Sequence, residues 1–483
     1  MRNELFLQKA EELRPKLYEE TLELKTDRIV LKAGELFVFD FGNHYVGTFS
    51  VTFSSVGHHM DAPLFFRLQF AEIREELSQD TAQYHGWIAK SWIQQEEIHL
   101  DVLPETYETR RRYAFRFVKV HILSVSDNYS AVIEKVRARA FSSADDSRLE
   151  HPDFSEKDRV LDEISVRTLR SCMQEVFEDG PKRDRRLWLG DLRLEALANY
   201  ETYRNYDLVK RCLYLFAGTT LEEGRLASNL FLYPEVECDY QTMFDYTLFF
   251  VNTLYDYYEA TKDIETLKEL EPVCERQFAL LRACFKDNGR IDLSKAGMVF
   301  IDWNFTLDKE ASAQAVSIYA LRDFIKIEEI CNKDTDELRK ELSRLTDAAR
   351  AMQDAGSGLF VSGEKKQVSY LSQIWMILAE VVRKEEGREL LKKVEEDEDA
   401  VKMNSPYAYH HYIQALINVG EKEKAYEKMH TYWGGMIEKG TNTFWELYNP
   451  EDPLYSPYGG IIVHSFCHAW SCTPAYFLRK YYR

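Results

Sequence analysis

The densest cluster of chemically reactive side chains lies in residues 179–191, with the sequence Asp-Gly-Pro-Lys-Arg-Asp-Arg-Arg-Leu-Trp-Leu-Gly-Asp. The stretch holds three carboxylates, four basic side chains, one tryptophan and two glycines. Pro181 and the glycines favour a turn, so the charged side chains converge from a loop instead of spreading along a helix face. We expect this loop to form a ligand pocket; an ion-pair network that closes the loop is the alternative.

Two further motifs place an acid next to a tryptophan. Asp302 precedes Trp303, with Glu310 a few residues later, and Trp445 precedes Glu446. Hydrolysis of a glycosidic bond needs two carboxyl groups beside the bond, one protonated and one ionised. A neighbouring tryptophan raises the pKa of a carboxyl by desolvation and a neighbouring arginine lowers it, so the surroundings can assign the two roles. The sequence supplies the groups for this chemistry but does not assign the roles.

Composition and charge narrow the classes of function. With 62 basic and 81 acidic residues, the chain has a formal net charge of −19, which repels nucleic acid and anionic membranes, and we predict neither as a partner. No nucleotide-binding, dinucleotide-binding or zinc-protease motif occurs, and we expect no cofactor and no metal. The chain shows no signal peptide, no long apolar run and no Cys-x-x-Cys pair, which predicts a cytoplasmic protein. A small ligand fits these features, and a homo-oligomer remains possible.

The hydrophobic periodicity changes along the chain and predicts three segments. Residues 1–27 have a helix-like pattern that Pro15 interrupts, and residues 28–145 contain short alternating runs typical of an antiparallel β-sandwich. Residues 146–483 contain about twelve helix-like stretches, one of them capped by Ser405 and ended by Gly420. Because no sequence repeat indicates an open solenoid, we expect six helical hairpins that close as an (α/α)6 toroid, with the tryptophan–acid motifs in loops at one mouth.

These motifs resemble those of the family 78 glycoside hydrolases, the α-L-rhamnosidases. The signature of that family reads approximately D-C-P-x-R-D-E-R-x-G-W-x-G-D, and residues 179–191 follow it closely. The resemblance continues at Asp302 and Trp303, at Trp445 and Glu446, and at residues 465–471, Ser-Phe-Cys-His-Ala-Trp-Ser. Residues 39–47 are similar to the β-sandwich that precedes the catalytic domain of the family.

The resemblance implies a multidomain exo-glycosidase, with an N-terminal antiparallel β-sandwich followed by an all-α (α/α)6 toroid that removes a terminal α-linked deoxysugar with inversion. It implies Glu446 as the general base that activates water. The substrate would be a small carbohydrate, a rhamnoside or a related glycoside. The side chains expected around this sugar are Asp179, Arg183, Trp188, Asp191, Asp302, Trp303, Glu310, Trp445 and His468.

One position departs from the family pattern. The general acid of the family is the glutamate after Arg-Asp, and Arg185 occupies that place here, with one residue fewer before Trp188. Arginine cannot donate a proton at neutral pH. We expect Asp184 to supply the proton, with Asp179 as the next candidate and Glu310 as a third. Two other hypotheses stay open: a catalytically altered homologue that binds a sugar or serves in an assembly, and an (α/α)6 hydrolase with another specificity, such as an unsaturated glucuronyl hydrolase.

Overall fold

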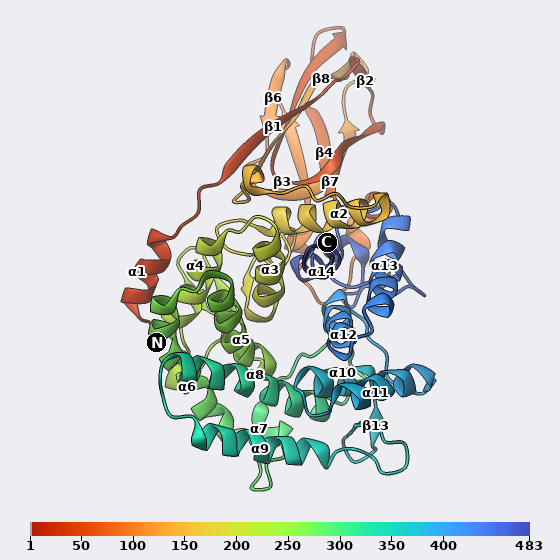
Figure 1. Cartoon of the computed structure of the whole chain (residues 1–483). Helices are drawn as coiled ribbons and strands as arrows, with labels where there is room; N and C mark the ends of the chain where they lie inside the picture. The colour runs from red at the N-terminus through yellow and green to blue at the C-terminus, as the bar shows by residue number, and fades with distance from the viewer. Residues whose placement is uncertain (1) are drawn as a thin grey trace.

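The computed structural model describes residues 2–483 and shows an N-terminal antiparallel sheet domain at one end of a larger helical domain (Figure 1). The expected order of a β domain followed by an α domain is therefore confirmed. The strands of the sheet domain are β1 (Tyr18–Leu24), β2 (Ile29–Leu31), β3 (Leu36–Gly57), β4 (Leu64–Ala71), β5 (Gln95–Leu100), β6 (Glu105–Glu108), β7 (Tyr113–Ser124) and β8 (Tyr129–Ser142).

Strand β3 organises the sheet domain because it is long enough to pair on two sides. Its residues 36–47 pair with β7 and its residues 47–57 pair with β8, all antiparallel. The strand order is β1-β8-β3-β7-β4-β5, with β2 on β8 and β6 on β3. Phe49, Phe53 and Phe66 are fully buried in the core that these strands enclose. This burial of alternate side chains is what the sequence pattern predicts.

The N-terminal segment differs from the expectation. Helix α1 covers only Glu4–Glu12, and residues 18–24 form strand β1 instead of more helix. A strand is favoured because Leu22 and Leu24 alternate with Glu23, so both leucines pack on the sheet core while the Glu23 carboxylate accepts a hydrogen bond from Arg137 at 2.7 Å. The prediction of a helical segment over residues 1–27 is thus wrong in its second half.

The helical domain begins at Glu156. Its helices are α2 (Glu156–Cys172), α3 (Leu189–Glu201), α4 (Tyr206–Gly218), α5 (Phe244–Thr261), α6 (Ile264–Leu281), α7 (Leu293–Ala296), α8 (Glu310–Ile330), α9 (Asp336–Arg350), α10 (Tyr370–Leu378), α11 (Lys384–Glu396), α12 (Pro406–Val419), α13 (Lys422–Glu438) and α14 (Pro474–Tyr481). Short strands β9 (Leu187–Trp188), β10 (Asn229–Phe231) and β11 (Glu237–Cys238) form one small sheet, and β12 (Val361–Ser362) pairs with β13 (Gln367–Val368).

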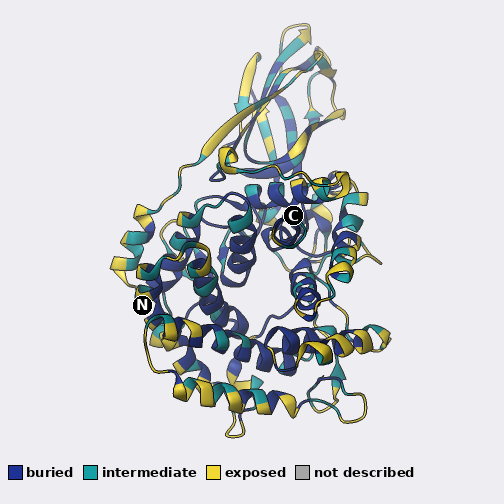
Figure 2. Cartoon of the chain, viewed as in Figure 1, coloured by how far each residue is buried: buried dark blue, intermediate teal, exposed yellow. Residues whose placement is uncertain are grey.

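The packing separates inner from outer helices. Helix α3 packs on α5, α5 on α8, α8 on α10 and α10 on α12, while α14 packs on α3. Residues 189–199 of α3 are all buried, and Figure 2 shows exposed faces on α9 and α11, outside this row. The predicted ends of α12 are confirmed, since the Ser405 hydroxyl accepts the N–H of Ala408 at 3.2 Å and Gly420 is left-handed with φ of 87°. Within residues 2–483, no helix combines the length and apolarity that a membrane span requires.

A buried charge cluster joins the two domains. The connection between β4 and β5 carries Glu72 and Glu76, and the ammonium of Lys182 donates to Glu76 and lies 3.8 Å from Glu72. All three side chains are buried. Glu72 also accepts the N–H of Phe466 at 2.6 Å, while the Lys182 ammonium donates to the carbonyl oxygen of His464 at 2.8 Å. The sheet domain thereby holds in place the two loops around Lys182 and around Phe466.

A close backbone approach extends this contact. A side chain at Gly86 has no room, because an added Cβ would lie 1.9 Å from the carbonyl oxygen of Tyr458. Nearby, the Tyr84 hydroxyl donates to that same carbonyl at 2.8 Å, and the Trp87 indole donates to the carbonyl oxygen of Pro457 at 2.9 Å. The sheet domain is therefore fixed against the loop that carries Tyr458.

Candidate active site

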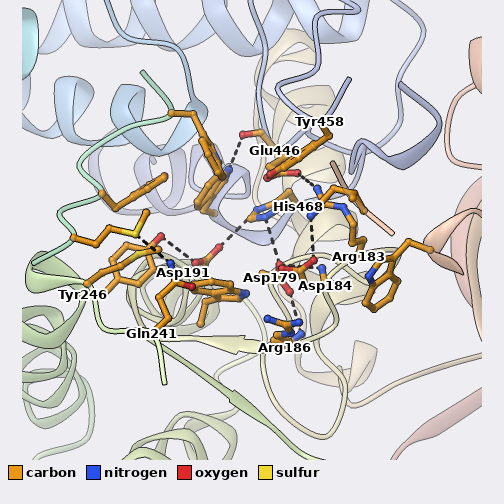
Figure 3. A pocket seen from close by; sticks show the side chains of 18 of the residues that line it. Asp179, Arg183, Asp184, Arg186, Asp191, Gln241, Tyr246, Glu446, Tyr458 and His468 are labelled. Atoms are coloured by element: carbon orange, nitrogen blue, oxygen red, sulfur yellow. Dashed lines mark hydrogen bonds and ion pairs between the residues drawn. The ribbon is translucent and has the colours of Figure 1, made fainter. Parts of the chain in front are cut away.

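A cavity of about 590 Å³ is lined by side chains of both domains. Figure 3 shows carboxylates, arginines and aromatic rings pointing into it. Eight of the side chains expected from the sequence line it: Asp179, Arg183, Asp184, Trp188, Asp191, Trp303, Glu446 and His468. Rings that offer flat apolar faces, together with a few convergent polar groups, are typical of a site for a small polar ligand such as a sugar.

Three expected side chains do not reach this cavity. Asp302 accepts hydrogen bonds from the Ser405 hydroxyl and from the N–H of Asn404 at 2.7 Å, and so fixes the loop before α12. Glu310 binds the guanidinium of Arg290 through both carboxylate oxygens, each at 2.8 Å. The indole of Trp445 is buried and donates to the Thr441 hydroxyl at 2.9 Å. These residues support the loops of the site instead of lining it, because tertiary packing turns their side chains away.

The loop of residues 179–191 is folded around the carboxylate of Asp179. This carboxylate accepts the N–H of Asp184 at 3.1 Å and the N–H of Arg186 at 3.0 Å. The Ser465 hydroxyl donates to the carbonyl oxygen of Arg183 at 2.8 Å. The N–H of Ala469 donates to the backbone carbonyl oxygen of Asp179 at 2.8 Å. The charged stretch and the motif of residues 465–471 are thus one structural unit.

One guanidinium binds two carboxylates at the cavity wall. Arg183 Nη1 donates to Asp184 Oδ1 at 3.0 Å and its Nη2 donates to Glu446 Oε2 at 3.1 Å. The Tyr458 hydroxyl donates to the other oxygen of Glu446, and the Tyr458 ring stacks 3.9 Å from the guanidinium carbon. Burial raises the pKa of Glu446, while the positive charge of Arg183 opposes that shift. The arrangement supplies a paired set of carboxyl groups with different surroundings.

The floor of the cavity carries Asp179, Asp191 and His468. Burial raises the pKa of Asp179 to about 8, and the charge of Asp184 adds to the shift. Burial, with the charge of Asp179, holds the pKa of Asp191 well above its usual range. The His468 ring lies between them, 4.0 Å from Asp179 and 3.7 Å from Asp191, and burial holds its pKa well below the usual range. These shifts keep the floor mostly uncharged at neutral pH.

Several polar atoms of this site make no hydrogen bond to the described part of the protein. Among the described residues, no hydrogen bond reaches Asp191 Oδ1, His468 Nδ1, Trp188 Nε1 or Trp303 Nε1, although all four atoms are buried. Buried polar atoms are normally satisfied, so these atoms are suited to the hydroxyl groups of a ligand. No cluster of three or more His, Cys, Asp or Glu side chains within residues 2–483 is arranged to hold a metal ion.

Comparison with known families identifies the chain. The profile of the glycosyl hydrolase family 78 alpha-rhamnosidase N-terminal domain matches residues 8–140. The profile of the bacterial alpha-L-rhamnosidase 6 hairpin glycosidase domain matches residues 156–482. The chain belongs to glycoside hydrolase family 78. It is an α-L-rhamnosidase-like glycosidase, as the motif resemblance predicts.

Solved structures agree with the assignment to family 78. A rhamnosidase from Klebsiella oxytoca with rhamnose bound matches with a TM-score of 0.95 and 40% identity, over 100% of this chain and 99% of that one. The family 78 rhamnosidase of Bacillus sp. GL1 matches with a TM-score of 0.80 and 19% identity, over 94% of this chain and 47% of that one. The Streptomyces avermitilis α-L-rhamnosidase complexed with L-rhamnose matches with a TM-score of 0.70 and 18% identity, over 96% of this chain and 44% of that one. The last two show the fold alone. A comparison with curated proteins gave no match.

Arg185, which departs from the family 78 signature, does not line the cavity that holds Glu446. Its backbone is left-handed, with φ of 63°, and its guanidinium donates to the carbonyl oxygens of Arg112 at 2.8 Å and Lys182 at 3.3 Å. Asp184, the preceding residue, faces the cavity instead. The substitution that the sequence shows therefore leaves a carboxyl group inside the site.

Several aromatic side chains of this cavity were not predicted from the sequence. Tyr246, Phe300, Tyr458 and Trp470 line the cavity, as do Trp87, Ile88, Ala89 and Trp92 from the sheet domain. Asp245 positions Phe300 by accepting its N–H at 2.9 Å. The Pro-, Gly- and Tyr-rich run that precedes residues 461–463 was the available signal for Tyr458. The 87–92 segment lies in a different domain, and no pattern in the sequence indicates that it reaches the helical domain.

Proposed function

We propose that this protein is an exo-acting α-L-rhamnosidase that removes a terminal α-linked rhamnose, or a closely related deoxysugar, with inversion. The observation that carries the proposal is the guanidinium of Arg183, which binds Asp184 and Glu446 at the wall of a cavity whose floor has unpaired polar atoms. The rhamnose-bound relative from Klebsiella oxytoca, at 40% identity over the whole chain, supports rhamnose as the sugar.

The proposed catalytic domain is an (α/α)6 toroid built from six hairpins. The helix pairs would be α2 with α3, α4 with α5, α6 with α8, α9 with α10, α11 with α12 and α13 with α14. The row of inner contacts from α3 to α12, with the return contact from α14 to α3, supports closure. The active-site loops of residues 179–191, 298–305 and 446–470 would then lie at one mouth of the toroid.

Glu446 is the proposed general base. It would take a proton from the water that attacks the anomeric carbon, while the glycosidic oxygen on the opposite face receives a proton from Asp184. The carboxylates of Asp184 and Glu446 bind the same guanidinium, so the distance between them is at most the width of that group plus two hydrogen bonds. This distance is compatible with the carboxyl spacing of about 6.5–9.5 Å in inverting enzymes. Arg183 would keep Glu446 ionised and oriented.

We propose that Asp179 stores the proton for the acid step at neutral pH. Burial, with the charge of Asp184, raises the pKa of Asp179 to about 8. Asp179 would hold the proton in the resting state, and Asp184 would face the glycosidic oxygen. Trp188 and Trp303 would pack on the sugar ring, while Asp191 and His468 would bind its hydroxyl groups through the atoms that lack protein partners.

The substitution Glu446→Gln tests the role of the base. The amide keeps the size of the side chain and can still accept from Arg183 and donate to the Tyr458 oxygen, but it cannot accept a proton from water. We expect kcat for p-nitrophenyl α-L-rhamnoside to fall by roughly 10²–10⁴-fold in a variant that still folds. Glu341→Gln, a matched exchange at a surface ion pair with Arg282, should leave kcat within about twofold. A wild-type protein that binds rhamnose in calorimetry but releases no aryl aglycone would favour the altered, sugar-binding homologue instead.

The substitution Asp184→Asn tests the acid. Protonation matters most for poor leaving groups, so we expect methyl α-L-rhamnoside to lose far more rate than p-nitrophenyl α-L-rhamnoside. Relative rates on the two substrates are measured for the wild type and the variant under the same conditions. Equal losses on both substrates would remove Asp184 from this role.

A further inference from the structure

The cavity that holds Glu446 is the proposed sugar cavity. A second cavity of about 540 Å³ adjoins it. The two share three lining residues, Trp92, Asp184 and Arg186, so they meet at the carboxyl group that we assign to the general acid. A general acid protonates the oxygen that joins the leaving group to the sugar, so the leaving group must lie next to Asp184, beyond that oxygen. The second cavity occupies a position that this requirement allows.

Arg185 contributes a positive charge to the second cavity. Its side chain lines the cavity, with the guanidinium carbon 5.8 Å from the centre of the Trp92 ring. Its hydrogen bonds go to two backbone carbonyls, and within residues 2–483 it makes no ion pair. Burial and the nearby charge of Arg112 lower the pKa of Arg185 to about 9, which still leaves it charged at neutral pH.

The other charges around this cavity are already paired. Arg112 binds both oxygens of Glu178, at 3.0 and 2.8 Å, and Glu175 binds Arg14 at 2.7 Å. The guanidinium of Arg186 lies 3.7 Å from Asp239. A buried charge without a partner is unfavourable, so the cavity is best matched by a ligand that brings one negative charge.

Aromatic side chains form part of the remaining wall. Trp92, Phe231 and Tyr233 line the cavity, and the guanidinium carbon of Arg186 lies 4.4 Å from the centre of the Phe231 ring. These side chains present flat apolar faces next to the cationic groups. Such a wall is suited to a ring-shaped ligand that packs against aromatic side chains.

We propose that the second cavity is the binding site for the leaving group, and that Arg185 selects a leaving group that carries a carboxylate. The inference rests on the proposed rhamnosidase function and names the substrate class of that same site. The leaving group would be a ring with one carboxylate: either an aromatic acid linked through a hydroxyl group or a uronic acid residue. Its carboxylate would receive hydrogen bonds from the Arg185 guanidinium while its linking oxygen faces Asp184.

The test compares 4-carboxyphenyl and 4-carbamoylphenyl α-L-rhamnosides, which differ in one negative charge. The ratio of their kcat/KM values is measured for the wild type, for Arg185→Gln and for Arg110→Gln. The Arg110 side chain is exposed and lines neither cavity, so its variant controls for general loss of positive charge. We expect the wild-type ratio to exceed the Arg185→Gln ratio by at least about tenfold, while Arg110→Gln keeps the wild-type ratio. Dividing the wild-type ratio by the Arg185→Gln ratio removes the intrinsic difference between the two phenols as leaving groups.

Two disaccharide substrates distinguish the sources of the carboxylate. A rhamnosyl uronic acid and the corresponding rhamnosyl hexose are compared in the same way. A preference for both acidic substrates, lost in Arg185→Gln, supports recognition of the carboxylate itself. A preference confined to the aryl pair assigns the site to aromatic acids, and one confined to the disaccharides assigns it to uronic acids.

The outcomes separate this inference from the proposed function. If the wild type hydrolyses none of the four rhamnosides, the rhamnosidase proposal fails, and the inference fails with it. If the wild type and Arg185→Gln have the same ratio of kcat/KM for acidic over neutral substrates, only the inference is overturned. The leaving group then lies over the exposed apolar rim of Trp87, Met298 and Phe305. Should Arg185→Gln not fold, product inhibition of the wild type decides: 4-hydroxybenzoate must inhibit at least about tenfold more strongly than 4-hydroxybenzamide.

Discussion

At the scale of single residues, Arg183 determines the electrostatics of the site. It is buried, it binds Asp184 and Glu446, and it stacks on Tyr458. Its charge therefore opposes the effect of burial on the pKa of Glu446. Within residues 2–483 no guanidinium pairs with Asp179 in this way, and burial raises the pKa of Asp179 to about 8. Carboxyl groups whose surroundings act differently on their pKa values, in the same cavity, are what acid–base catalysis requires.

These pKa shifts predict a bell-shaped dependence of kcat/KM on pH. The base must be ionised for the reaction. Because burial raises the pKa of Glu446, the acidic limb of the profile should lie above about pH 4.3, the ordinary pKa of a glutamate. The acid must keep its proton, so the rate should fall as pH rises through about 8. Methyl α-L-rhamnoside is the suitable substrate because its cleavage needs the acid. Asp179→Asn should move the alkaline limb to lower pH, and an unmoved limb would exclude Asp179 as the store of the proton.

The side chains that were found or missed show what sequence can predict about a site. Asp179, Arg183, Trp188 and Asp191 belong to one short stretch, so their types and spacing indicate a common loop. Glu310 and Trp445 were wrongly expected in the cavity because the direction of a side chain depends on neighbours that sequence does not show. The position of Arg185 shows the same limit, since Asp184 and Arg186 line the cavity that holds Glu446, whereas Arg185, between them in the chain, does not.

At the scale of elements, the active-site loops depend on the charge cluster of Lys182, Glu72 and Glu76. Replacing Lys182 with methionine leaves the buried carboxylate of Glu76 without its cation, while Glu72 keeps its ion pair with His44 at 3.1 Å. We expect the free energy of unfolding to fall by about 3–5 kcal/mol, measured by urea denaturation, because breaking a buried ion pair leaves an uncompensated charge. Lys340→Met, at an exposed pair with Glu337, should change it by less than about 1 kcal/mol.

The double variant Lys182→Met/Glu76→Gln provides the control for this interpretation. Removing one of the two carboxylates should recover part of the lost stability, because less charge is then left unpaired. An effect of Lys182→Met no larger than that of Lys340→Met would show that the cluster does not hold the domains together.

Secondary structure was predictable where periodicity was strong. The order of the two domains and the ends of α12 follow from local pattern and capping residues. Strand β1 was missed because Tyr18–Leu24 is too short to separate a strand from a continuing helix, and pairing with β8 decides its conformation. The pairing partner lies more than a hundred residues away in the chain, where local sequence carries no information about it.

At the scale of the whole molecule, the sugar cavity belongs to both domains. Trp87 and Trp92 come from the sheet domain, whereas Glu446 and His468 come from the helical domain. A ligand in this cavity should therefore stabilise both domains together. We expect one thermal transition whose calorimetric and van't Hoff enthalpies agree, and a midpoint that rises with rhamnose concentration. Two separate transitions, with only one shifted by rhamnose, would contradict this picture.

Glu446 and Asp184 are the proposed inverting pair, although Arg185 replaces the glutamate of the family signature. Proton NMR of the first sugar that the wild-type protein releases from an aryl α-L-rhamnoside, recorded before the anomers equilibrate, tests this pair. Inversion predicts that β-L-rhamnose appears first, with the α anomer following only by mutarotation. Initial release of α-L-rhamnose, or no release under conditions in which the folded protein binds rhamnose, would exclude Glu446 and Asp184 as an inverting pair.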